Sequence, residues 1–173
     1  MTEMIFPEAV TTQGKRNAII LSAAPADPLA PTTTELGAGV NASMFFLGQY
    51  APTGSQNKGN SPRRLGQNGQ LEVLGNKTFT APTLSYVHDP QGDTADPANQ
   101  VKGALAEDNE VWIYSRVGID AEQAVAQGDV WRVDHLTCGH QWAVPSGDDE
   151  FAVEQITQET GYVEEPFSAT GGV

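Results

Sequence analysis

The sequence of 173 residues has one cysteine, nine basic residues and no long apolar run. One cysteine cannot form an internal disulfide, which indicates a reducing compartment. The longest apolar stretches, AIIL (18–21) and MFFL (44–47), are far too short to cross a bilayer. The N-terminal MTEMIFPEAV has acidic residues and an early proline where a signal peptide needs basic residues and an apolar run. We therefore expect a soluble protein that is not secreted and has no membrane partner.

Basic residues are scarcest in the second part of the chain. Residues 1–102 hold seven basic and eight acidic residues, whereas residues 103–173 hold two basic residues against fourteen acidic ones. Proteins that bind DNA neutralise its phosphates with Lys and Arg. The second part of the chain is therefore expected to repel DNA.

The chain also lacks the short motifs that mark common catalytic sites. It has no G-x-S-x-G, no P-loop and no G-x-G-x-x-G. SGDDE (146–150) lacks the alternating oxygen ligands of a calcium-binding loop. We expect no enzymatic activity, no metal and no cofactor.

Turn-forming residues are plentiful, which favours short strands joined by turns within one domain. PADPLAPTTTE (25–35) is expected to be extended or irregular because of its prolines. Asp96-Pro97 is a typical helix start, so we predict a short helix over 97–107. Alternating or continuous apolar residues predict strands, with a break at Pro82, over 17–24, 42–50, 71–88, 110–118, 130–144 and 151–157.

The fold class that follows from these patterns is mainly β, as one domain over residues 17–160 with one short helix. Residues 1–16 are interpreted as an N-terminal arm and residues 161–173 as a C-terminal extension. Residues 51–70 hold no aromatic residue and a single leucine, so we expect a long polar loop that cannot fold alone. The basic cluster Lys58, Arg63 and Arg64 lies in this loop and suits an acidic surface on another copy.

HLTCGHQ (135–141) holds two of the three histidines and the only cysteine. In a regular strand Cys138 and His140 would share one face and His135 the other. Two ligands on one side do not make a tetrahedral zinc site, and a Cys–His pair needs a third, orienting group to act as a nucleophile. We interpret both histidines as ordinary strand residues and Cys138 as a small apolar core residue.

The second half of the chain resembles the major tail protein family of long-tailed bacteriophages. The residues that carry the resemblance are VWIYSRVGIDAEQAVAQGDVWRVDHLTCGHQ (111–141) and the following WAV and FAV, together with the order of the earlier elements. The resemblance implies a β-sandwich or rolled barrel, six copies in a ring, and rings stacked into a tail tube through which DNA leaves the capsid.

The resemblance also implies partners and positions. The partners would be other copies of the chain, the tape measure, terminator and tip proteins, and double-stranded DNA that passes without specific binding. Arms and the long loop would bridge neighbouring rings, which gives Lys58, Arg63 and Arg64 as ring-to-ring contacts. An acidic lumen would be lined by some of Glu110, Asp129 and Asp134. The protein would lie in the virion tail after assembly in the bacterial host cytoplasm.

Two other classes of function remain open at this point. One is a capsid decoration or head–tail joining protein, which would also be rich in strands and acidic. The other is a ligand-binding β-sandwich such as a carbohydrate module. Its stacking face would come from the aromatic residues Trp112, Tyr114, Trp131 and Trp142.

Overall fold

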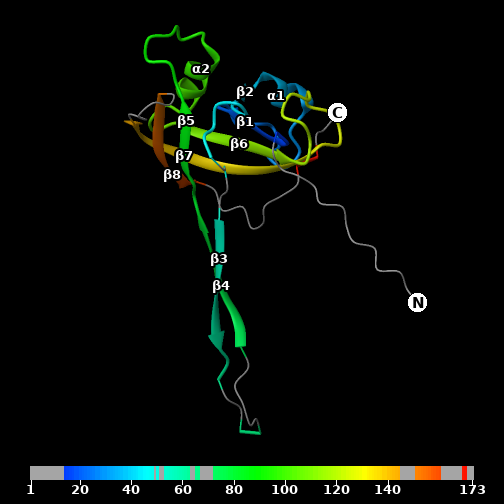
Figure 1. Cartoon of the computed structure of the whole chain (residues 1–173). Coiled ribbons are helices and arrows are strands. Elements are labelled where there is room, and N and C mark those ends of the chain that lie inside the picture. Colours follow the sequence, from blue (N-terminus) through cyan, green and yellow to red (C-terminus); the bar gives the residue numbers. More distant parts are fainter. Residues whose placement is uncertain are drawn as a thin grey trace, which may run out of the picture.

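One antiparallel sheet that curls back on itself dominates the computed structural model (Figure 1). The structure describes residues 14–48, 50, 53–62, 65–66, 72–144, 151–160 and 169–170, so most of the expected N-terminal arm and C-terminal extension lies outside the described residues. The elements are β1 (Arg16–Leu21), α1 (Thr33–Ala38), β2 (Val40–Asn41), β3 (Thr53–Asn60), β4 (Glu72–Thr80), β5 (Thr83–Val87), α2 (Pro97–Ala104), β6 (Glu110–Val117), β7 (Val130–Val144), β8 (Ala152–Glu159) and β9 (Ala169–Thr170).

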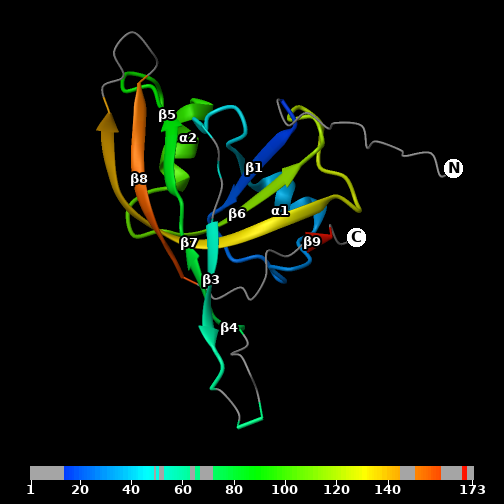
Figure 2. The same ribbon diagram turned by 60° about the horizontal axis from the view of Figure 1, so that its bottom comes forward.

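The strand order β2-β1-β6-β7-β8-β5 explains the curl, because the far edge of the sheet returns to the segment that follows β2. Phe46 forms a bridge to Tyr86 of β5, and the Leu47 amide donates to the Ser85 carbonyl at 2.8 Å. β9 pairs with the start of β7, whereas β3 and β4 form a separate two-stranded sheet. The mainly β prediction, a sandwich or rolled barrel, is therefore confirmed by the curled sheet seen in Figures 1 and 2.

The inner face of the curl holds the larger hydrophobic core. Alternating residues of β1, β6 and β7 point into it, and α2 packs against them with two of its apolar residues, Val101 and Ala104. The fully buried members include Ile20, Ile113 and Leu136. Burying each such side chain stabilises the fold by about 1.5–3 kcal/mol.

A buried polar network joins the end of α2 to the sheet. The last carbonyl groups of a helix have no partner within it. Gln155 of β8 donates to the Leu105 carbonyl at 2.8 Å, and Gln141 of β7 donates to the Lys102 carbonyl at 3.0 Å. The Tyr86 hydroxyl completes the network by donating to Gln155 at 3.1 Å. These contacts fix the helix at one position over the sheet.

The opposite face of β1, β6 and β7 carries a second core. It contains Ile19, Tyr114 and Trp131, covered by Leu36 of α1. The Tyr114 hydroxyl donates to the Pro28 carbonyl at 2.8 Å, which ties the proline-rich segment before α1 to the sheet. Both faces of the central strands are thus buried, which explains why the apolar run of β1 is nearly continuous.

The two helices show one confirmed prediction and one correction. α2 begins at Pro97 with Asp96 as its N-cap, as the sequence indicated. α1 was not predicted, because the prolines of 25–35 were read as a sign of extended structure. A capping box forms it: the Thr32 hydroxyl accepts from the Glu35 amide, and the Glu35 carboxylate accepts from the Thr32 amide. The spacing T-x-x-E was the signal in the sequence.

Most predicted strands are confirmed. β7 spans 130–144 as predicted, β6 and β8 match within two residues, and residues 81–82 separate β4 from β5 around Pro82. The strand predicted over 42–50 is wrong, since most of this segment is a turn in which the Phe45 and Phe46 amides donate to the Ala42 carbonyl. Residues 145–150, between β7 and β8, lie outside the described residues.

Candidate interaction surfaces

A two-stranded hairpin extends from the body on the side away from both helices (Figure 1). β3 and β4 pair from Thr53↔Thr80 to Asn60↔Glu72, with an irregularity between Gln56 and Lys58. The prediction that 51–70 is one long loop is therefore wrong for 53–60. The physical reason is that backbone pairing with β4 orders a polar segment that has no core to bury.

Nearly every side chain of the hairpin is exposed. Among them are apolar ones: Leu74 is 69% exposed and Val73 is 46% exposed. Leu74 is paired with Lys58 and Val73 with Gly59, so the two apolar side chains lie on opposite faces. An exposed ribbon with apolar side chains is a surface that gains stability from a partner.

The basic residues of the hairpin are placed in part. Lys58 forms an exposed ion pair with Glu72 at 3.3 Å, which contributes little free energy because water screens both groups. Arg63 and Arg64 lie outside the described residues. Residues 51–80 hold four basic residues against one acidic residue, a net charge of +3, and the rest of the chain holds five basic and twenty-one acidic residues, a net charge of −16. The hairpin is thus a basic projection from an acidic body.

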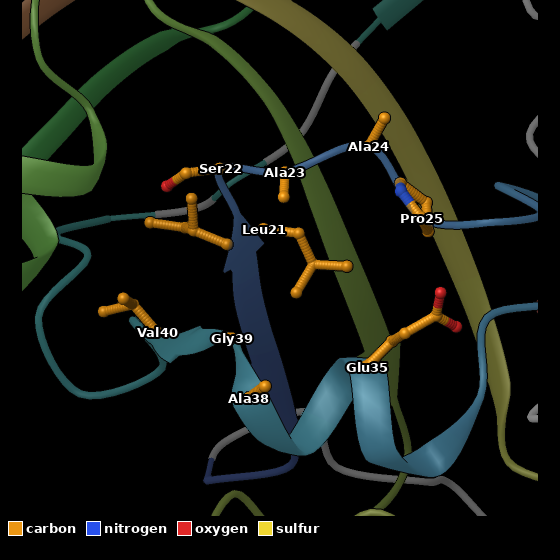
Figure 3. Close-up of a pocket in the computed structure, with 10 residues that line it drawn as sticks. Leu21, Ser22, Ala23, Ala24, Pro25, Glu35, Ala38, Gly39 and Val40 are labelled. Carbon is orange, nitrogen blue, oxygen red and sulfur yellow. The ribbon is translucent and has the colours of Figure 1, made fainter.

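A mostly apolar groove of about 320 Å³ lies beside α1 (Figure 3). Leu21, at the end of β1, lies between segment 22–25 and the turn from α1 into β2. Gly39 makes this turn possible, because a Cβ there would lie 2.6 Å from side-chain carbons of Ile19 and Leu21. Glu35 extends toward Pro25 and its carboxylate accepts from the Ala26 amide at 2.9 Å, so it joins the two walls.

Hydrogen bonds help to keep the Glu35 carboxylate charged. Hydrogen bonds from the Ala26 and Thr32 amides and from the Thr32 hydroxyl lower its pKa. Residues 22–41 contain Asp27 and Glu35 and no lysine or arginine. The groove therefore combines an apolar floor with a negative rim.

A second exposed apolar surface lies on the outer face of β7 and β8. Trp142 is 60% exposed and Ile156 is 65% exposed. His140 packs edge-on against Trp142, with 4.6 Å between ring centroids. No helix among the described residues covers this face.

The three acidic residues expected near a lumen have three different environments. Glu110 is exposed and lies 3.5 Å from His135. Asp129 is buried and its charge is compensated by Arg116. Asp134 is mostly buried and accepts from the Tyr50 hydroxyl at 2.9 Å and from Arg132 at 3.2 Å. Burial raises the pKa of Asp134, and nearby Arg132 opposes this rise. Of the three, Glu110 presents an uncompensated carboxylate to solvent most fully.

The Arg116–Asp129 pair is a structural feature that the sequence analysis missed. The Arg116 side chain is fully buried and donates to Asp129 and to the Gln123 and Ala124 carbonyls. Its guanidinium also lies 4.9 Å from the ring centroid of Trp131. The pair therefore holds the long connection between β6 and β7 against the sheet. The sequence did contain a signal for this pair. Arg116 lies within a mostly apolar strand segment, and Asp129 comes directly before the next strand.

The structure changes one part of the prediction for HLTCGHQ. Cys138 is buried in the core, as expected, and burial raises its pKa to about 11. His140, however, does not share its face. A bulge between Cys138 and Gln141 adds one residue to β7 and turns Gln141 inward and His140 outward. Gly139 permits this, because a Cβ there would lie 2.7 Å from the Ile156 carbonyl oxygen.

The histidines have partners of their own. His140 Nδ1 lies 2.9 Å from the Glu107 carboxylate, and His135 stacks on Trp112 with 4.2 Å between ring centroids. Within the described ranges no group of three or more His, Cys, Asp or Glu residues is placed to hold a metal ion.

The aromatic residues do not form a stacking face for a carbohydrate. Tyr114 and Trp131 are fully buried in the second core. Trp112 is partly buried against His135, and Trp142 lies on the exposed outer face of β7 and β8. The positions of these four aromatic residues therefore do not support the alternative of a carbohydrate-binding module.

Comparison with known families now supplies the class of protein. The sequence model described as phage tail tube protein matches residues 4–165, nearly the whole chain. This chain belongs to the phage tail tube protein family. The match confirms the resemblance drawn from 111–141 and favours a tail tube protein over a decoration protein or a ligand-binding module.

The family makes the chain a structural protein of the virion tail that assembles with itself and with other tail components. A structural family of this kind indicates a role that is not enzymatic. No curated protein sequence matches the chain. None of the helices in the described part of the chain is long and apolar enough to span a membrane.

Proposed function

We propose that copies of this chain form rings of six that stack into the phage tail tube, and that DNA passes through this tube during ejection. The observation that supports stacking most directly is the exposed hairpin. It projects from the body on the side away from both helices, and its exposed apolar and basic groups gain from a neighbour (Figure 1). A contact between two different surfaces of identical subunits, repeated without closing, generates a stack.

In this proposal Lys58, Arg63 and Arg64 contact the next ring. Their charge is opposite to that of the rest of the chain, which carries a net charge of −16. Tape measure, terminator and tip proteins would bind the tube and its ends, and assembly would take place in the host cytoplasm.

The experiment is negative-stain electron microscopy of concentrated purified protein, without any cofactor. Tubes built from stacked rings are the expected result. A matched variant replaces residues 53–80 by a short Gly-Ser linker, and it should give folded protein and rings without tubes. A wild-type chain that stays monomeric at high concentration would contradict the proposal, and tubes of normal length from the linker variant would show that the hairpin is not the stacking contact.

We further propose that exposed carboxylates, Glu110 among them, face the lumen. Carboxylates repel phosphates within a Debye length of about 8 Å at physiological salt, so DNA would slide without binding. Asp129 is left out because Arg116 compensates its charge, and Asp134 contributes less because it is mostly buried.

Glu110→Lys should allow tube assembly and slow DNA release, most strongly at low salt, because a lysine adds affinity through counterion release. Glu110→Gln is the matched control with neutral charge and should have a weaker effect. Release rates equal to wild type at every salt concentration would exclude Glu110 from the lumen.

A further inference from the structure

The hairpin and the groove beside α1 have complementary chemistry, and both surfaces belong to the same chain. The groove has an apolar floor around Leu21 and a negative rim at Glu35. One hairpin face carries an exposed leucine, Leu74, directly opposite a lysine, Lys58. We propose that Leu74 of one copy inserts into the groove of the next copy while Lys58 binds the Glu35 carboxylate. This inference rests on the proposed stacking of rings and names the surface that receives the hairpin.

Spacing on the hairpin supports the pairing. Residues directly opposite in an antiparallel pair have Cβ atoms about 4.5–5.5 Å apart and point to the same side. A leucine seated in the groove therefore brings the lysine side chain to the rim. Leu21 on the floor and Glu35 on the rim likewise line the same groove (Figure 3).

Docking requires Lys58 to leave Glu72 and bind Glu35 of the next copy, and the charged groups allow this exchange. The Lys58–Glu72 pair is exposed on both sides, with 66% and 69% of the side chains accessible. Such a pair is held weakly. The Glu35 carboxylate accepts three hydrogen bonds, and a carboxylate has about four lone-pair sites. One further bond from an ammonium group is therefore possible without loss of the capping box.

The size of the groove fits a side chain rather than a large ligand. Its volume of about 320 Å³ is at the lower limit of small-molecule pockets. Its walls are built from small residues, Ala23, Ala24 and Ala38, which leave room for a branched side chain. In Figure 1 the hairpin extends from the body away from α1, the helix beside the groove, so we take the partner to be another copy.

Cross-linking of assembled protein tests this contact directly. The native Cys138 is buried and does not interfere. The double variant Leu74→Cys, Ala38→Cys should give a ladder of disulfide-linked oligomers on a non-reducing gel after mild oxidation. A mixture of the two single variants should give dimers and no higher species. The matched control, Leu74→Cys with Gln91→Cys on an exposed turn, should give at least tenfold less cross-linked product.

The outcomes separate the contact from the function. Tubes that form without cross-linking, or with equal cross-linking in the control, would overturn the groove contact and leave the tail tube function standing. A fast-migrating cross-linked monomer would show that each hairpin reaches its own groove, which also overturns the inference. Absence of tubes from the wild-type chain would overturn the proposed function and this inference with it.

A charge reversal gives a second readout. Leu74→Asp places a carboxylate in an apolar groove with a negative rim and should reduce the mass of tubes at least tenfold, with rings retained. Val73→Asp lies on the opposite face of the hairpin and should retain tubes. Equal loss from both variants would show that the Leu74 face is not the specific contact. Lys58→Glu should reduce the mass of tubes more than Lys58→Gln, because only the glutamate is repelled by the negative rim of the groove, and equal effects of the two variants would remove the ion pair from the contact.

Discussion

The body and the hairpin reach ordered structure in opposite ways. In the body, apolar side chains are buried on both faces of β1, β6 and β7, so the fold is stabilised within one chain. In the hairpin, β3 and β4 are paired through their backbones while nearly all of their side chains stay exposed, and a two-stranded hairpin by itself is marginally stable in water. The difference indicates that the body is stable within one chain, whereas the hairpin gains stability when it binds a partner. Substitutions in the two regions should therefore have opposite consequences for folding and for assembly.

The largest loss of stability is expected for Arg116→Leu. It leaves Asp129 buried without a counter-charge, which costs about 3–5 kcal/mol in free energy of unfolding. The measurement is urea unfolding followed by tryptophan fluorescence. The double variant Arg116→Leu, Asp129→Leu removes both charges and should recover part of the loss. A single variant as stable as wild type would show that the pair does not hold the β6–β7 connection.

A matched pair of leucines compares the two regions most directly. Leu136 is 1% exposed in the core and Leu74 is 69% exposed on the hairpin. Leu136→Ala should lower the free energy of unfolding by about 2–5 kcal/mol, whereas Leu74→Ala should change it by less than about 0.5 kcal/mol. Tube formation should follow the reverse order, with Leu74→Ala the more damaging, when it is measured at a low temperature at which Leu136→Ala is still folded. Similar unfolding losses in both would contradict the comparison.

Cys138→Ala should have a smaller effect, a loss of about 1 kcal/mol from trimming a small buried group. The thiol should react slowly with a maleimide dye in the folded protein, because it is buried and its pKa is raised to about 11. Reaction in urea gives the reference rate. Stoichiometric zinc that leaves together with stability when a chelator is added would overturn the interpretation of HLTCGHQ.

The smallest effect concerns pH. Burial raises the pKa of Asp134 in the folded state, so the folded state holds this proton at pH values where the unfolded carboxyl, with a pKa near 3.9, has lost it. The cost is absent below the unfolded pKa and grows as pH rises through the folded pKa. Asp134→Asn should therefore lose less stability than wild type as pH rises from 4 to 7, measured by thermal unfolding. Parallel curves would contradict the assignment.

The central strands could be predicted from sequence because their chemistry is local. Both ends of the strand Val130–Val144 were predicted, although the bulge at Gly139 was not. A bulge depends on the partner strand, here β8, and one added residue reverses every side chain after it. His140 was misplaced for this reason.

The candidate site was predicted less well than the fold, since it depends on contacts between distant residues. The polar residues 53–60 gave no strand signal, because the partner strand lies beyond the tip and no side chain is buried. The groove joins the end of β1 to α1 and β2, and α1 itself was missed. The family resemblance did supply ring-to-ring contacts for Lys58, Arg63 and Arg64, which stay predictions.

The pairing of β1 has a consequence for the order in which the chain folds. β1 carries Ile19, Ile20 and Leu21, and its partner in the sheet's interior, β6, is made about 90 to 100 residues later. Contacts of such long range form slowly. During synthesis β1 lacks this partner until β6 has been made, and unpaired apolar strands of neighbouring chains can pair with each other. Many copies of the chain are needed for one tube. The rate at which β6 pairs with β1 therefore determines which fraction of the chains folds correctly before their unpaired strands pair with each other.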